Sequence, residues 1–251
     1  MSNGGDGTIY FQGTTSGGTS TSLGGYDVSV TSSGTYYFRA LSAEGCWSSE
    51  LAVPVIVQTI PIAYDVIGGG EYCSGGTGLP VGLSGSSAGV IYALFNAAGP
   101  VGMPFMGTGA PLFFGMQTNA SNYTVIATDL VTGCTNNMNG FAVILIAPLP
   151  AVQTVTGGGS YCSGGSGVSI GLSNSQTGVD YQLYNGTTMV GSPVAGNGTS
   201  LDFGLLADAG TYTILARDPI TYCASAMAGS AVVSINTCLL YTSDAADDTP
   251  C

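Results

Sequence analysis

Four cysteines recur at matched positions and are the residues whose spacing most clearly indicates chemistry. Cys73 and Cys162 each follow a glycine-rich segment, and Cys134 and Cys223 lie 61 residues beyond them. This spacing predicts one disulfide in each of two similar segments, Cys73–Cys134 and Cys162–Cys223. On a chain-entropy estimate, closing such a loop stabilises a fold by about 4 kcal/mol. Paired cysteines also favour an oxidising, extracellular location, and we expect Cys46 to be unpaired.

Metal binding is the alternative chemistry for these positions. The chain has no histidine and no C-x-x-C spacing, which disfavours a zinc site or a reactive thiol pair. Asp129 and Asp218 precede Cys134 and Cys223 by five residues. Calcium would need several converging oxygens and there is no D-x-D pair, so we expect each aspartate to cap a turn.

The charge inventory excludes several functional classes. Only 6% of the 251 residues are charged, the net charge is −12, and Arg39 and Arg217 are the two cations. A chain without histidine or lysine lacks the usual general base, the Schiff-base amine and the lysine of a phosphate-binding loop. Nucleic-acid binding requires clustered cations. We therefore expect no enzyme activity, no cofactor, no metal and no nucleic-acid partner.

An internal duplication organises the elements that position these residues. Residues 61–148, the middle repeat, align without a gap with residues 150–237, the C-terminal repeat, and 40 of the 88 positions are identical. The run G-G-G-E-Y-C-S-G-G-T-G returns as G-G-G-S-Y-C-S-G-G-S-G. A more divergent, truncated copy precedes both. The period matches one small sandwich domain, and we interpret the glycine runs as flexible entries to each repeat.

The pattern within each repeat is that of strands. Short alternating apolar runs are separated by Gly, Ser, Asn and Pro at the spacing of a β-sandwich. In the C-terminal repeat, Tyr181 and Leu183, and likewise Leu201 and Phe203, alternate as strands with one buried face require. The sequence predicts an all-β protein whose two full repeats are the same seven-stranded sandwich.

One motif resembles the immunoglobulin fold in particular. The segment D-A-G-T-Y, ending at Tyr212, is similar to the D-x-G-x-Y that opens strand F of immunoglobulin domains. The resemblance implies a tyrosine corner at Tyr212 and at the matching Tyr36 and Tyr123. The cysteine and tryptophan that usually accompany the motif are absent. The fold class implied is tandem immunoglobulin-like β-sandwich domains.

The combined motifs resemble a wider family. Y-C-S-G-G-x-G, then G-V-x-Y-x-L-Y/F-N, then G-T-Y-T and a loop cysteine are similar to tandem Ig-like repeats of large secreted or cell-surface proteins of Bacteroidota. Those proteins are adhesins or gliding-type proteins associated with type IX secretion. The resemblance implies an exported, repetitive stalk and carries over no catalytic residues.

These observations divide the chain into four parts. We expect a truncated Ig-like module at 1–59, Ig-like repeats at 60–148 and 149–237, and a disordered tail at 238–251. The tail resembles a translated sequencing adapter from Cys238 onward.

Two functions fit this organisation. The first is a structural or adhesive stalk of an extracellular surface protein, whose partners are neighbouring repeats, surface glycans or other cell-surface proteins. The second is a carbohydrate-binding module region of a secreted hydrolase. The apolar run at residues 141–152 is too short to span a membrane.

Overall fold

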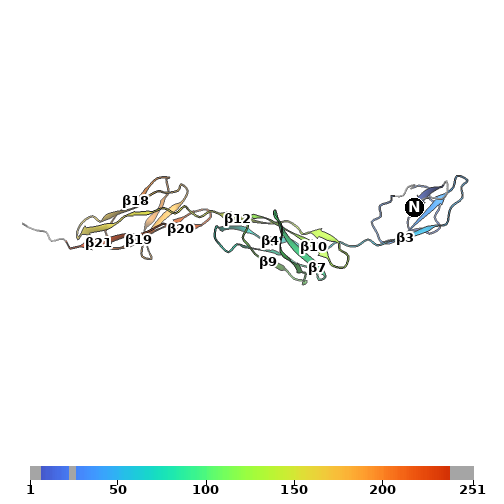
Figure 1. The fold of residues 1–251 in the computed structure, drawn as a ribbon, viewed down its shortest axis with the longest axis horizontal. Coiled ribbons are helices and arrows are strands. Elements are labelled where there is room, and N and C mark those ends of the chain that lie inside the picture. The colour runs from blue at the N-terminus through green and yellow to red at the C-terminus, as the bar shows by residue number, and fades with distance from the viewer. Residues whose placement is uncertain (1–6, 23–26, 238–251) are drawn as a thin grey trace, which may run out of the picture.

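A computed structural model describes residues 7–22 and 27–237 of the chain, as three β-structured units in a row (Figure 1). Every regular element within those residues is a β-strand, so none of them forms a helix that could cross a membrane. The expected tail, residues 238–251, lies outside the described residues. The first unit is one sheet of β1 (Thr8–Phe11), β2 (Gly34–Leu41) and β3 (Leu51–Val55), in that order.

The middle repeat folds into two sheets. The smaller sheet has the order β4 (Val66–Gly68), β6 (Leu79–Leu83) and β9 (Leu112–Gln117). The larger sheet has the order β5 (Gly70–Cys73), β12 (Ala142–Ala147), β10 (Ser121–Asp129), β7 (Val90–Asn96) and β8 (Gly99–Met106), with β11 (Thr135–Asn137) also paired to β10.

The C-terminal repeat has the same topology, strand for strand. Its smaller sheet has the order β13 (Val155–Gly157), β15 (Val168–Leu172) and β18 (Leu201–Leu206). Its larger sheet has the order β14 (Gly159–Cys162), β21 (Ala231–Asn236), β19 (Gly210–Arg217), β16 (Asp180–Asn185) and β17 (Thr188–Ala195), with β20 (Ala224–Ala226) paired to β19.

This strand order is that of an immunoglobulin-like sandwich. In conventional letters the small sheet is A-B-E and the large one is A′-G-F-C-C′. The predicted all-β, tandem Ig-like fold is confirmed, but each repeat has nine strands rather than seven. One extra strand is the short hairpin partner of strand F, and the other arises because the first strand is divided between the two sheets.

The glycine runs are where the first strand crosses from one sheet to the other. Gly68 and Gly69 have positive φ angles of 101° and 81°. A Cβ on Gly68 would lie 2.1 Å from the carbonyl oxygen of Pro80, in the small sheet. A Cβ on Gly69 would lie 2.4 Å from that of Val143, in the large sheet. The runs are therefore a tightly packed crossing point rather than the flexible entry that the sequence suggested.

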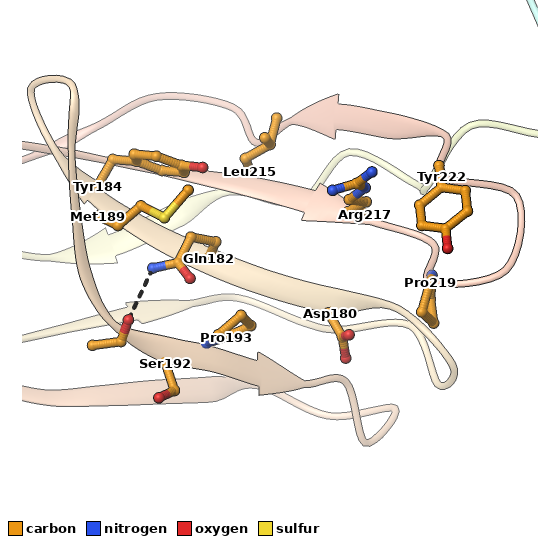
Figure 2. Close-up of a pocket in the computed structure, with 11 residues that line it drawn as sticks. Asp180, Gln182, Tyr184, Met189, Ser192, Pro193, Leu215, Arg217, Pro219 and Tyr222 are labelled. Carbon is orange, nitrogen blue, oxygen red and sulfur yellow. Dashed lines mark hydrogen bonds between the residues drawn. The ribbon is translucent and has the colours of Figure 1, made fainter.

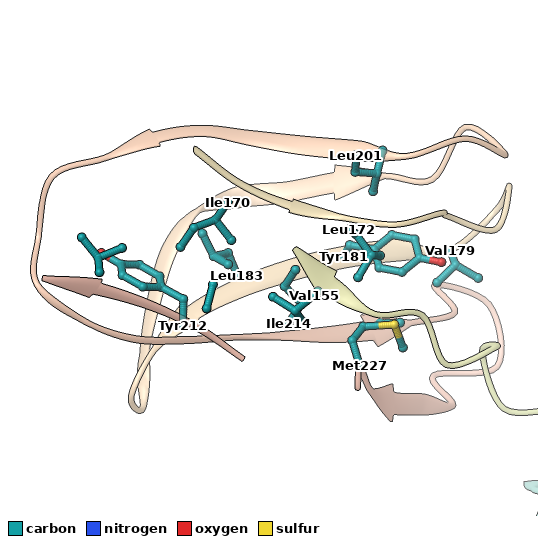
Figure 3. Close-up of a cluster of buried hydrophobic side chains, with 13 residues drawn as sticks. Val155, Ile170, Leu172, Val179, Tyr181, Leu183, Leu201, Tyr212, Ile214 and Met227 are labelled. Atoms are coloured by element: carbon teal, nitrogen blue, oxygen red, sulfur yellow. The ribbon is translucent and has the colours of Figure 1, made fainter. Parts of the chain in front are cut away.

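Each core fills the space between its two sheets. In the C-terminal repeat, side chains from both sheets point into one cluster (Figure 3). The fully buried Tyr181 belongs to this cluster, and its hydroxyl accepts a hydrogen bond of 2.8 Å from the backbone N–H of Gln176. In the middle repeat, the hydroxyl of the buried Tyr92 accepts a hydrogen bond of 2.9 Å from the backbone N–H of Ser87. These tyrosines stand where a conventional immunoglobulin domain has its buried tryptophan.

Candidate functional site

The loop that carries each second cysteine is held in one shape by an aspartate. Asp129 Oδ1 accepts hydrogen bonds from the backbone N–H groups of Val131 and Thr132, both at 2.9 Å. Asp218 Oδ1 accepts the equivalent hydrogen bonds from the backbone N–H groups of Ile220 and Thr221, at 2.8 and 3.0 Å. These N–H donors hold the pKa of both carboxyl groups below the ordinary value.

The aspartates thus cap turns, as expected, and fix the cysteine that follows. The backbone N–H of Asp129 donates to the carbonyl of Cys134, and that of Asp218 to the carbonyl of Cys223, both at 2.9 Å. Within residues 7–22 and 27–237, no three acidic, cysteine or histidine side chains come together as a metal site would require.

The two cysteines of one repeat lie at opposite ends of its sandwich. Cys73 pairs with Ala147, the last residue of β12, where the chain leaves the middle repeat. Cys134 lies beyond the far end of β10, close to the chain's entry, since Asn136 donates to the carbonyl of Pro61. The nine residues of β10 span about 27 Å. A disulfide requires Cα atoms closer than about 7 Å.

The observed disulfide therefore joins the two repeats. Cys73 is bonded to Cys223, with an S–S distance of 2.01 Å and a Cα–Cα distance of 5.5 Å. The predicted pairs Cys73–Cys134 and Cys162–Cys223 are wrong, because the partner that lies near Cys73 belongs to the following repeat. Cys162 is also disulfide-bonded. Among the described cysteines, Cys46 is exposed and free, as expected, and Cys134 is a half-buried free thiol.

Three tyrosines make the hydrogen bond of a tyrosine corner. The hydroxyl groups of Tyr36, Tyr123 and Tyr212 donate to the backbone carbonyls of Ser32, Asn119 and Asp208, at 2.7, 2.9 and 2.8 Å. Burial, followed by the nearby Asp208 carboxylate, raises the pKa of Tyr212. These residues stabilise the corner before strand F in each unit and are buried, so they have no access to a ligand.

A groove of about 530 Å³ lies on the outer face of the large sheet of the C-terminal repeat (Figure 2). Arg217, Tyr222 and Asp180 line one end, and Tyr184 and Met189 line the other. Asp180 and Arg217 are direct neighbours across β16 and β19.

The groove was not predicted from the sequence, although a signal for it is present. At the equivalent positions of the middle repeat, Arg217 is replaced by Thr128 and Tyr222 by Gly133. A residue-by-residue comparison of the two repeats therefore exposes the one place where the C-terminal repeat gains a cation and an aromatic ring together.

No family model matches the sequence, and no curated protein matches it. Similar solved structures include the fibronectin(III)-like modules of Clostridium thermocellum CbhA, with a TM-score of 0.34 at 11% identity over 70% of this chain and 92% of that chain. Sidekick-1 immunoglobulin domains 1–4 match with a TM-score of 0.25 at 14% identity, over 91% of this chain and 66% of that chain. One chain of the crystal structure of mouse coronavirus receptor-binding domain complexed with its murine receptor matches with a TM-score of 0.38 at 13% identity, over 66% of this chain and 96% of that chain. The fold assignment rests on the strand order of this chain.

Proposed function

We propose that this chain is part of a non-catalytic stalk, in which Ig-like modules at 1–59, 60–148 and 149–237 are set end to end on an extracellular surface. The observation that carries the proposal is the Cys73–Cys223 disulfide, which ties the exit of one repeat to the entrance of the next. A disulfide between two domains has no role where the domains move freely about a flexible linker. In a rod-like protein it maintains the relative orientation of the two domains.

The peptide connection between the repeats supports the same function. The linker contains Pro148 and Pro150, which restrict its backbone. The first residues of the C-terminal repeat then pack on their own repeat, because the backbone N–H of Gln153 donates to Met227 Sδ at 3.3 Å and the N–H of Ala228 donates to the carbonyl of Gln153 at 2.8 Å. The equivalent Tyr64 makes the same two contacts in the middle repeat. Two connections, one peptide and one disulfide, restrict bending and rotation at the junction more than a single linker does.

The disulfide also redirects tension along the chain. A force applied at the two ends enters the middle repeat through β4 and β5, crosses from Cys73 to Cys223, and leaves through β20 and β21. The strands from β6 to β19 lie between the bonded cysteines and off this path. Most of both sandwiches is therefore shielded from unfolding under load.

An extracellular location is part of the proposal and is supported by the disulfide chemistry. Disulfides persist in oxidising compartments, and small secreted domains use them to supplement a modest core. The net charge of −12 favours a soluble, mutually repelling surface. The sequence resemblance to Bacteroidota surface repeats points to a bacterial cell surface as the place where such a stalk would stand.

Single-molecule pulling of the whole chain from its two ends tests the proposal. With the Cys73–Cys223 junction bond formed, the chain between the bonded cysteines, a separation of 150 residues, does not contribute to the measured extension. The Cys73→Ser/Cys223→Ser variant should release those residues and lengthen the fully unfolded chain by about 500 Å, at roughly 3.5 Å per residue. Both proteins are made in a Cys162→Ser background, so that only the junction bond differs.

The control is Cys46→Ser, which removes a free thiol of the first unit and should leave the extension unchanged. Small-angle scattering of the same proteins should show a broader distribution of shapes when the junction bond is absent. Equal unfolded lengths with and without the two cysteines, or identical scattering, would contradict a covalently stiffened stalk.

A further inference from the structure

The strongest unexplained feature of the molecule is the backbone at Tyr222. Among residues 7–22 and 27–237 it is the one residue other than glycine with a positive φ, 60°. The equivalent Gly133 has a φ of 71°, so the loop shape is shared and glycine is its strain-free occupant. A tyrosine at such a position is strained, and the residue is 65% exposed. Burial therefore does not explain the residue, whereas contact with a ligand would.

Tyr222 is coupled to the single cation of the two full repeats. The guanidinium carbon of Arg217 lies 4.7 Å from the centroid of the Tyr222 ring, a cation–π contact. Arg217 is exposed and forms no ion pair with any described residue. The Asp180 carboxylate lies at the neighbouring position across the two strands, but no ion pair joins it to Arg217, so the N–H groups of the guanidinium remain available to an anion.

The rest of the groove offers side-chain oxygens and a second aromatic ring. Gln182 Nε2 donates to the backbone carbonyls of Leu183 and Val190 at 2.8 and 3.1 Å, which fixes the amide. Its oxygen remains as an acceptor. Asp180 supplies a carboxylate acceptor next to Arg217, and the half-buried Tyr184 closes the opposite end (Figure 2).

We propose that this groove binds an acidic oligosaccharide. A sugar carboxylate pairs with Arg217, sugar hydroxyls donate to Asp180 and Gln182, and the apolar faces of the sugar rings pack on Tyr222 and Tyr184. The volume of about 530 Å³ suits a ligand of two to three sugar rings.

The position on the sheet favours a saccharide over a peptide. Peptides commonly bind sheets by adding a strand at an edge, where backbone N–H and C=O groups are free. The floor of this groove is formed by β16, which pairs on one side with β17 and on the other with β19. The backbone groups of β16 are therefore already used in the ladder, so along the floor of the groove a ligand meets side chains. The free edge of the sheet is the outer side of β17.

The test is calorimetric titration of the whole chain with trigalacturonate, with its methyl ester as the uncharged match, and with a pentaglutamate peptide. We expect trigalacturonate to bind with a dissociation constant below about 1 mM, and the ester to bind at least tenfold more weakly, which corresponds to a loss of about 1.4 kcal/mol. The peptide should not compete.

Two variants restore the residues of the middle repeat. Arg217→Thr and Tyr222→Gly should each weaken trigalacturonate binding at least tenfold. Because Tyr222→Gly removes backbone strain, loss of folding cannot account for its loss of binding. The matched control is Ile220→Val, the corresponding exchange at an exposed position of the same loop, and it should bind as the parent chain does.

Three results would overturn the proposal. Absence of trigalacturonate binding at 1 mM, on the order of the weakest affinity expected for such a site, excludes the acidic saccharide. Equal binding of the ester excludes the role of Arg217 as the carboxylate partner. Competition by pentaglutamate would assign the groove to an acidic peptide instead.

Discussion

The outer faces of the two large sheets differ far more than the cores behind them. In the C-terminal repeat this face presents Asp180, Gln182, Tyr184, Arg217 and Tyr222. The same positions of the middle repeat hold, in the same order, Ile91, Ala93, Phe95, Thr128 and Gly133. One face carries both charge signs and two phenol rings, and the other is almost entirely apolar.

The cores, in contrast, match position by position. Tyr92, Leu94 and Tyr123 of the middle repeat correspond to the buried Tyr181, Leu183 and Tyr212. A buried side chain is enclosed on all sides, so a change in its volume or polarity costs stability. A side chain on the outer face borders solvent and can change at little cost. The duplication therefore preserved one scaffold and left each repeat free to acquire its own surface.

The largest effect expected concerns the shared scaffold and should be equal in both repeats. Gly68→Ala and Gly157→Ala place a Cβ 2.1 and 2.2 Å from a backbone oxygen, at positive φ. Each should lower the local stability of its own repeat by about 3 kcal/mol, from strain and overpacking together. Hydrogen exchange read by peptide would measure this. Gly75→Ala has open space around its Cβ and serves as the strain-only control. A loss in one repeat alone would break the equivalence of the scaffolds.

The tyrosine corners should give the next largest effect, again equal in the two repeats. Tyr123→Phe and Tyr212→Phe each remove a hydroxyl that donates to a backbone carbonyl, at a cost of about 1–2 kcal/mol. Because the folded state raises the pKa of Tyr212, its stabilisation is present below about pH 10 and is lost as the pH rises through the folded-state pKa.

Alkaline unfolding of the C-terminal repeat, followed by hydrogen exchange or circular dichroism, checks this sign. Tyr212→Phe should remove the part of the alkaline loss that Tyr212 contributes. Tyr184→Phe, at a half-buried tyrosine of the same sheet, is the control and should change little. An unchanged alkaline profile in Tyr212→Phe would contradict the assignment.

Exchange of one loop residue should affect the two repeats with opposite sign. Tyr222→Gly should stabilise the C-terminal repeat by about 1 kcal/mol, and Gly133→Tyr should destabilise the middle repeat by a similar amount, because glycine adopts this φ without strain. Local opening free energies from hydrogen exchange would show both shifts. If Tyr222→Gly instead destabilises its repeat, the tyrosine has a packing role and the argument for a ligand weakens.

The smallest effect concerns the two aspartate-capped loops. Their backbone N–H donors lower the folded-state pKa of Asp129 and Asp218. The resulting stabilisation is present above the unfolded pKa of about 4 and is lost as the pH falls through the lower folded-state value. Asp129→Asn and Asp218→Asn should each slightly reduce the acid sensitivity of the melting temperature, by matching amounts. A clear effect in only one repeat would show that the loops differ.

Much of the fold could be predicted from the sequence because its signals are local or repeated. The ungapped alignment of residues 61–148 with 150–237 already required one topology for both. Alternation at Tyr181 and Leu183 predicted a strand with one buried face. The resemblance of the D-x-G-x-Y motif implied a tyrosine corner at Tyr212, and the structure shows its hydrogen bond to the carbonyl of Asp208. The split of the first strand was missed, because a glycine run indicates backbone freedom without indicating which two sheets the chain lies between.

The sequence by itself determined that the chain is a duplicated all-β protein, because alternation and repetition are properties of the chain order. The tertiary structure alone decided which thiols meet. The separation of 61 residues between Cys73 and Cys134 says nothing about the strand β10 that holds them at opposite ends of a sandwich. The groove was decided in the same way, since Asp180 and Arg217 become neighbours only when β16 and β19 pair. Cross-strand distance depends on register, which the sequence of any one strand does not contain.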